Sequence, residues 1–236
     1  MLREKYLLLN NIKDIEPILF RYLTFIAGGA ITSIFSSTKI NDYDIYFKYP
    51  MSEIKIKEML YELEGFNYNV KCKSDNAISL EHTATGTKLQ LIVKENCIGK
   101  PKDVIKMFDF TICKAYYDFE TEELYLGEDF LRHLAEKRLV LSDNLIYPLS
   151  TLFRTKKYTK KGYVMSAVDY IKLGLSINNL KIESFKDLRE HIIAIDTMFL
   201  KALTDKMLEN TECYDYKKAI EWIENYIDKH YGGEIF

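Results

Sequence analysis

The chain has 236 residues, of which 47% are hydrophobic and 29% charged, an ordinary composition for a globular protein that can bury a core. Its formal net charge of -2 provides no overall attraction to nucleic acid. Any binding of that kind must therefore rest on a local basic patch.

The cysteines and the apolar stretches exclude several other classes. Cys72, Cys97, Cys113 and Cys213 lie far apart without a CxxC pair, which argues against a zinc ribbon and a disulfide framework. The N-terminus lacks the apolar run of a signal peptide. The longest nearly apolar stretch, residues 24–35, has about half the length of a membrane span. We expect a cytoplasmic protein with reduced cysteines that does not bind a membrane.

The first half of the chain alternates between helical and strand patterns. The apolar spacing predicts helices over residues 2–23, 30–37, 51–64 and 101–107. Strands are predicted over residues 25–27, 42–47, 69–73, 77–82, 88–93, 108–117 and 123–126. These elements predict a small mixed sheet with helices on one face.

From residue 128 onward the strand pattern stops and only helical spacing remains. Helices are predicted over residues 130–137, 148–161, 163–176, 185–208 and 216–231. The sequence therefore predicts an α+β fold in two domains, a mixed-sheet head over residues 1–126 and an all-helical C-terminal domain over residues 127–236.

Two short motifs in the head carry the chemistry. Gly28-Gly29 lies between a predicted strand and a helix, a turn whose missing Cβ atoms and helix N-terminus suit phosphate groups. Asp42 and Asp44 alternate along the next strand, so their carboxylates point to the same face. Such a pair suits Mg²⁺ (or Mn²⁺), which accepts carboxylates together with substrate phosphates. We predict a metal and nucleotide site here, although each motif alone is more often a plain turn or a solvated strand face.

A third motif gives the arrangement a family resemblance. Asp109-Phe-Thr-Ile-Cys-Lys-Ala leads into Thr121-Glu-Glu-Leu, and a helical segment beginning at Phe130 follows. With Gly28-Gly29 and Asp42-x-Asp44, this order resembles the DNA polymerase beta nucleotidyltransferase superfamily, nearest the CCA-adding enzymes and bacterial poly(A) polymerases. The resemblance covers roughly residues 20 to 165. It implies a nucleotidyltransferase-type sheet with an NTP as substrate, and Asp109 would order the nucleotide side of the pocket.

The resemblance also indicates further nucleotide-binding positions and several departures. Thr32 and Ser33 stand where the family has an arginine and an aspartate after the glycines. Gln90 stands where many members place a third carboxylate. Arg154 and Lys157 lie in a basic helical run that echoes the family's neck helix, and they would assist the triphosphate. The family's element for choosing C or A has no clear counterpart.

Two classes of function follow from these motifs. The first is a metal-dependent enzyme that moves a nucleoside monophosphate from an NTP to a hydroxyl, with an RNA 3′ end as the acceptor favoured by the resemblance. A protein hydroxyl or a small molecule is the alternative acceptor. The second is a degenerate member that binds nucleotide or RNA, or assembles with a protein partner, without catalysis.

Overall fold

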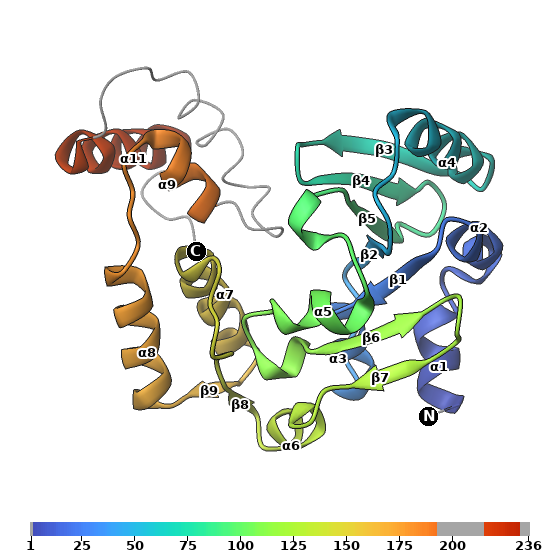
Figure 1. Ribbon diagram of the computed structural model, residues 1–236, viewed down its shortest axis with the longest axis horizontal. Helices are drawn as coiled ribbons and strands as arrows, with labels where there is room; N and C mark the ends of the chain where they lie inside the picture. Colours follow the sequence, from blue (N-terminus) through green and yellow to red (C-terminus); the bar gives the residue numbers. More distant parts are fainter. Residues whose placement is uncertain (1, 193–214, 232–236) are drawn as a thin grey trace. The chain divides into compact units, whose positions relative to one another are not determined.

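The computed structural model describes residues 2–192 and 215–231, which form two compact units (Figure 1). The first unit comprises residues 1–146 and 158–169, and the second comprises residues 147–157 and 170–236. The predicted division at residue 126 falls inside the first unit. Part of the predicted helix over residues 185–208 lies outside the described residues. No helix in the described ranges is both long and apolar enough to cross a membrane.

A seven-stranded mixed sheet forms the centre of the first unit, with the strand order β3-β4-β5-β2-β1-β6-β7. Its strands are β1 Thr24–Ala27, β2 Tyr43–Phe47, β3 Tyr68–Lys73, β4 Ala77–His82, β5 Lys88–Ile92, β6 Ala115–Asp118 and β7 Leu124–Leu126. The pairing of β2 with β5 is parallel, and the other pairings within this sheet are antiparallel. The predicted α+β class with a mixed sheet is confirmed.

The helices of the first unit lie on both faces of the sheet, whereas helices on one face were expected. They are α1 Leu2–Leu9, α2 Glu16–Arg21, α3 Gly29–Phe35, α4 Glu53–Gly65, α5 Pro101–Lys106 and α6 Phe130–Ala135. Lys5 of α1 lies over the ring of Tyr117, whereas Lys102 of α5 lies over the ring of Tyr125. Tyr125 pairs with Tyr116, so the rings of Tyr117 and Tyr125 project from opposite faces. The helix α5 therefore covers the face opposite to α1.

Two predicted elements differ from the structure. The helix predicted over residues 2–23 is divided into α1, a short 3-10 turn over Lys13–Ile15, and α2. The strand predicted over residues 108–117 begins only at Ala115, because Phe110 bridges to Leu141 and the chain then makes a 3-10 turn over Thr111–Cys113. Residues that pair with such a distant segment carry no local pattern that would distinguish them from a strand.

The segments after residue 128 are mostly helical, but they contain a second, very short sheet. The helices are α7 Pro148–Lys160, α8 Ala167–Asn178, α9 Phe185–Ile192 and α11 Tyr216–Tyr231. Arg138–Leu139 (β8) pairs in parallel with Val164–Met165 (β9), which corrects the prediction that strands end before residue 128. Phe185, Leu188, Ile192 and Ala219 form the apolar core of the second unit.

Candidate nucleotide and metal site

The glycine turn joins the end of β1 to the start of α3. Gly28 has φ +77° and ψ −126°, a backbone conformation that an L side chain rarely adopts. Its N–H donates to the carbonyl of Ala115 at 3.1 Å, which ties the turn to the beginning of β6. A Cβ atom on Gly28 would lie 3.2 Å from the ring of Phe108, whereas one on Gly29 would meet open space. The backbone at Gly29 can therefore be approached closely by a ligand.

The two predicted carboxylates lie beside this turn. Asp44 belongs to β2 and Asp42 directly precedes the strand, and both are half-buried. Ile45 of β2 pairs with Ile26 of β1, so one further step of the antiparallel register brings Asp44 next to Ala27. Tyr43 and Ile45, which point to the opposite face, are fully buried. The local pattern therefore holds the carboxylates on the face where the chain turns at Gly28.

Gln90 adds an amide oxygen to the same face. It lies directly opposite Asp44 in the parallel pair of β2 and β5, which places both side chains on one side of the sheet. The Gln90 side chain is buried, and its Oε1 atom has no hydrogen-bond partner. This acceptor is therefore open to a hydrogen bond or a coordination bond from a ligand or water.

These residues fit a hard divalent cation. Asp42, Asp44 and Gln90, which we call the oxygen donor set, carry the carboxylate and amide oxygens that Mg²⁺ accepts as ligands. The described residues contain no group of three or more His, Cys, Asp or Glu side chains arranged for a metal. Within the oxygen donor set, Asp42 and Asp44 are the two charged groups, and Gln90 contributes a neutral amide oxygen.

Thr32, Ser33 and Asp109 lie close to the turn but differ in their surroundings. The Thr32 hydroxyl contacts the carbonyl oxygens of Ile112 at 2.6 Å and of Gly28 at 3.2 Å, and it can donate to one of them at a time. Ser33 is buried in α3. Asp109 is half-buried, and its carbonyl accepts a hydrogen bond from the Ser142 N–H. The role of these three residues in nucleotide binding stays a prediction.

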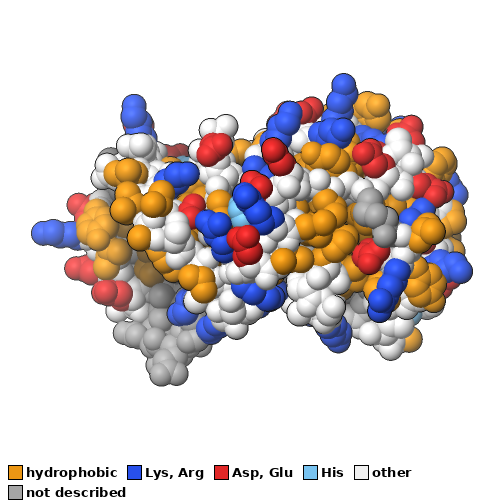
Figure 2. Space-filling model, turned by 90° about the horizontal axis from the view of Figure 1, so that it is seen from below, with side chains coloured by type: hydrophobic (Ala, Val, Ile, Leu, Met, Phe, Trp, Pro, Cys, Tyr) orange, Lys and Arg blue, Asp and Glu red, His pale blue; other side chains and the backbone are white. Residues whose placement is uncertain are grey.

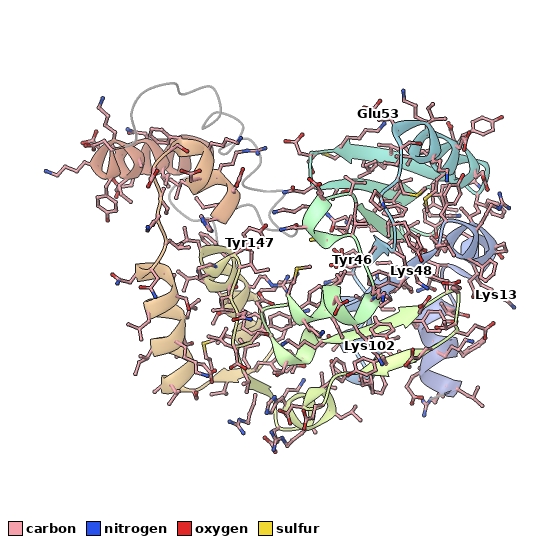
Figure 3. The ribbon with its side chains drawn as sticks, viewed as in Figure 1. Lys13, Tyr46, Lys48, Glu53, Lys102 and Tyr147 are labelled. Carbon is pink, nitrogen blue, oxygen red and sulfur yellow. The ribbon has the colours of Figure 1, made fainter. Side chains whose placement is uncertain are left out.

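An aromatic row that the sequence reasoning missed lies on the carboxylate face. Phe25 stacks on Tyr46 with ring centroids 5.3 Å apart, and Tyr116 stacks on Tyr125 at 5.1 Å. Phe108 leans against Tyr46 at 5.8 Å and also closes one side of the glycine turn. In the sequence, the aromatic residue directly before Asp109 was the available signal for this aromatic row. Tyr46 is labelled in Figure 3.

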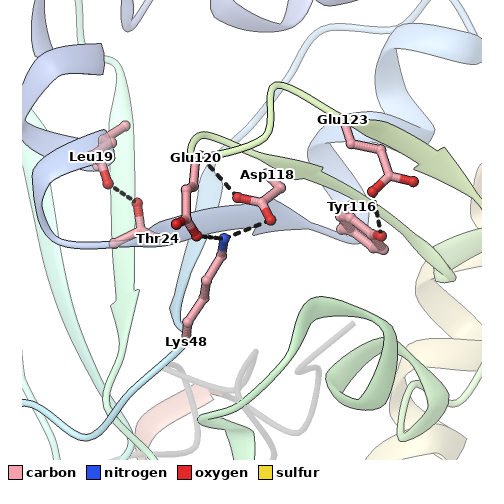
Figure 4. A network of polar contacts seen from close by, with 7 residues as sticks. All are labelled: Leu19, Thr24, Lys48, Tyr116, Asp118, Glu120 and Glu123. Atoms are coloured by element: carbon pink, nitrogen blue, oxygen red, sulfur yellow. Dashed lines mark hydrogen bonds and ion pairs between the residues drawn. The ribbon is translucent and has the colours of Figure 1, made fainter.

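At the opposite end of β2, a cluster of charges is fully paired. Lys48 Nζ lies 2.7 Å from Asp118 Oδ2 and 2.6 Å from Glu120 Oε2, and the Lys48 and Asp118 side chains are 9% and 7% exposed (Figure 4). Burial by itself would lower the pKa of Lys48, but the hydrogen bonds with Asp118 and Glu120 outweigh it and raise that pKa. We call Lys48, Asp118 and Glu120 the paired cluster.

Arg154 and Lys157 lie on α7 in the second unit. Arg154 is half-buried and Lys157 is exposed. Their assignment to the nucleotide site stays a prediction. Elsewhere, basic and acidic side chains are interspersed across the face in Figure 2, so the charge there does not form a single-sign patch.

The fold is similar to that of CCA-adding enzymes. A CCA-adding enzyme in complex with ATP is 14% identical and has a TM-score of 0.57, with the match covering 95% of this chain and 62% of that chain. The complex of such an enzyme with CTP matches with the same identity and TM-score, covering 95% of this chain and 60% of the other. The Thermotoga maritima enzyme in complex with tRNA is 13% identical with a TM-score of 0.52, covering 94% and 59%. At these identities the likeness shows the fold alone.

Sequence comparison gives a narrower relationship. The protein named Gabija anti-defense 2 of Bacillus phage SPbetaL7 is 30% identical in an alignment of 222 residues that covers 91% of this chain. The chain covers 52% of that relative, so it spans about half the relative's length. The model of the family described as Gabija anti-defense 2 family protein matches residues 3–137, more than half of the chain. The chain therefore belongs to the Gabija anti-defense 2 family.

Proposed function

We propose that the chain is a metal-dependent nucleotidyltransferase that acts against the Gabija defence. The observation that carries this proposal is the oxygen donor set of Asp42, Asp44 and Gln90 on the face where β1 turns at Gly28. The family description supports the biological setting. The nucleotidyltransferase-like fold supports the reaction class.

Each residue of the candidate site would have a separate role in this reaction. Asp42 and Asp44 would hold Mg²⁺, which when bound neutralises phosphate charge and lowers the pKa of an attacking hydroxyl. Gln90 would direct its buried amide oxygen to the same place. The backbone at Gly29, where a Cβ would meet open space, would admit the phosphates. Asp109 would order the nucleotide side of the pocket.

The proposed reaction conserves its atoms without a further co-reactant. The acceptor hydroxyl oxygen forms a bond to the α-phosphorus of the NTP. The bond from that phosphorus to the oxygen bridging the α- and β-phosphates breaks, and pyrophosphate leaves with the electron pair. The hydroxyl proton passes to solvent by way of a carboxylate of the Asp42 and Asp44 pair.

The proposed function has two versions, which differ in the acceptor. An RNA 3′ end is favoured by the fold, because a similar enzyme is seen in complex with tRNA. A hydroxyl on a Gabija protein is favoured by the family description, which names that defence as the target. In both versions the NTP and metal half of the site is the same, so the acceptor can be tested separately.

A non-catalytic binder is the second candidate function. It is favoured by Gln90, because an amide next to Asp44 leaves the site with one negative charge fewer than three carboxylates would supply. Such a protein would bind nucleotide, RNA or a Gabija component and would act by occupying it.

The deciding experiment is label transfer from each of the four α-labelled NTPs, with Mg²⁺ or Mn²⁺, to total RNA and to purified Gabija proteins. Asp44→Ala should abolish the transfer while the fold is retained, and Asp14→Ala, an exposed acid in the same unit, should leave it unchanged. Label on RNA or on a Gabija protein identifies the acceptor. Metal-dependent NTP binding without any transfer would favour the non-catalytic binder, and transfer that survives in Asp44→Ala would refute the assigned site.

A further inference from the structure

Lys114 lies on the other side of the glycine turn from the carboxylates. Tyr116 of β6 pairs with Ala27 of β1, and Ala115 accepts a hydrogen bond from the Gly28 N–H, so Lys114 directly precedes the residue that contacts the turn. On the other side of β1, the register with β2 brings Asp44 next to Ala27, and Asp42 directly precedes β2. The turn is thus flanked by an acid on one side and a lysine on the other.

The backbone fixes Lys114 in this place. Its N–H donates to the carbonyl of Thr111 at 3.1 Å, and its own carbonyl accepts from the N–H of Gly127 at 2.8 Å. A Cβ atom on Gly127 would lie 2.8 Å from that carbonyl oxygen, so the approach requires a residue without a side chain. Ala115, the next residue, accepts the hydrogen bond from Gly28. The starting point of the lysine side chain is therefore held by direct contacts with neighbouring segments.

Partial burial disfavours the charged form of Lys114. The side chain is half-buried, and burial lowers the pKa of its ammonium, an effect that the carboxylates of Asp143 and Asp109 offset only in part. No residue in the described ranges forms an ion pair or a hydrogen bond with Nζ. Lys48, by contrast, has two carboxylates within 2.7 Å. A partly desolvated ammonium without a direct partner interacts more strongly with an anionic ligand than a fully hydrated one does.

We propose that Lys114 binds the phosphate chain of the nucleoside triphosphate at the glycine turn. This inference rests on the proposed function, and it assigns the positive charge that faces the phosphates from the side opposite Asp42 and Asp44. An ammonium group binds phosphate oxygens as a point charge with three donors. The lysine therefore favours ligands with a polyphosphate chain over nucleoside monophosphates.

The test is calorimetric binding of each of the four NTPs and of inorganic tripolyphosphate to the full chain in the presence of Mg²⁺. Lys114→Gln should weaken the binding of NTP and tripolyphosphate by about tenfold or more and leave the weaker binding of monophosphates unchanged. Lys114→Arg should retain most of the affinity. Lys106→Gln, which removes an exposed lysine paired with Asp103, is the matched control and should bind like the wild type.

Two outcomes would overturn the inference in different ways. Equal NTP affinities of Lys114→Gln and the wild type would refute the role of Lys114 and leave the proposed function standing. Failure of the wild type to bind any NTP with metal would refute the proposed function and this inference with it.

Thermal unfolding without nucleotide separates a ligand-binding role from a structural one. Lys114→Met removes a desolvated charge and should unfold at or above the wild-type temperature while it binds NTP more weakly. A clearly lower unfolding temperature would overturn the ligand-binding role in favour of a structural one.

Discussion

The two ends of β2 use buried polar groups in opposite ways. At the end near Lys48, each charge of the paired cluster has an opposite charge within 2.7 Å. At the end near Asp44, the neighbouring Gln90 Oε1 is buried without a hydrogen bond, and Lys114 Nζ has no ion pair or hydrogen bond in the described part of the chain. Paired groups stabilise a fold, whereas a buried polar group without a partner costs free energy that a bound ligand can offset. The difference separates the scaffold from the candidate site within one strand.

The largest expected effect on stability comes from breaking the paired cluster. Lys48→Met leaves Asp118 as a buried carboxylate without its cation, and this should lower the free energy of unfolding by about 3 kcal/mol. Urea unfolding followed by circular dichroism measures the change. The double variant Lys48→Met with Asp118→Leu should recover most of the loss, and its NTP affinity should equal that of the wild type. A large loss of NTP affinity in this double variant would contradict the separation of the two ends.

The glycine turn offers the next largest effect, because its two glycines differ in strain. Gly28→Ala places a Cβ on a residue with φ +77° and within 3.2 Å of Phe108, and it should lower the free energy of unfolding by about 2 kcal/mol. Gly29→Ala meets open space and should leave stability nearly unchanged while it weakens NTP binding. Unfolding curves and calorimetry on the same pair of variants test this, and equal losses of stability would count against the contrast.

Substitution of Gln90 should raise the free energy of unfolding, whereas substitution of Lys48 should lower it. Gln90→Leu replaces an orphaned acceptor with an apolar side chain of similar size, and this should raise the free energy of unfolding by about 1 kcal/mol. The same variant should lose metal-dependent NTP binding, and Gln90→Glu should retain or increase it. Stability and binding are measured on the same preparations. A Gln90→Leu variant that is both less stable and fully competent to bind would show that the amide is structural.

A pH-dependent effect concerns the segment that leads to Lys114. His133 is buried, its Nδ1 lies 2.8 Å from Thr111 Oγ1, and burial lowers its pKa below the ordinary 6.5. The unfolded chain then takes up a proton at His133 more readily than the folded chain does. The contribution of neutral His133 to the free energy of unfolding is therefore fully present above pH 6.5, and it is lost as the pH falls below that value. The slope from this one group cannot exceed about 1.4 kcal/mol per pH unit.

Unfolding at a series of pH values between 7.5 and 5 tests the role of His133. The wild type should lose stability relative to His133→Gln as the pH falls through this range. Parallel curves for the two proteins would contradict the assignment.

Several elements were predictable because their patterns are local. The strand over residues 77–82 and the helix over residues 216–231 have the predicted bounds, since strict spacing and nearby turn residues define them. The pairing of Phe110 with Leu141 and of β8 with β9 was not predictable, because these contacts are set by distant segments.

The residues of the candidate site also differ in how well the sequence alone predicts them. Gly28, Asp42 and Asp44 were identified from motifs whose meaning depends on spacing within a few residues. The surroundings of Gln90 and Lys114 depend on which strands are neighbours and in what register. A sequence pattern gives the residue type at these positions but not the burial or the missing partner that makes them informative.

The parallel pairing of β2 with β5 has a consequence for how the protein folds. Antiparallel neighbours can form by local hairpin closure, but Gln90 meets Asp44 only after residues 48–87, with α4, β3 and β4, have crossed over and returned. The oxygen donor set is therefore completed by a long-range contact, of the kind that slows folding. Metal binding at this place would thus report on the pairing of β2 with β5, and a partly folded chain without that pairing would lack the Gln90 oxygen at the site.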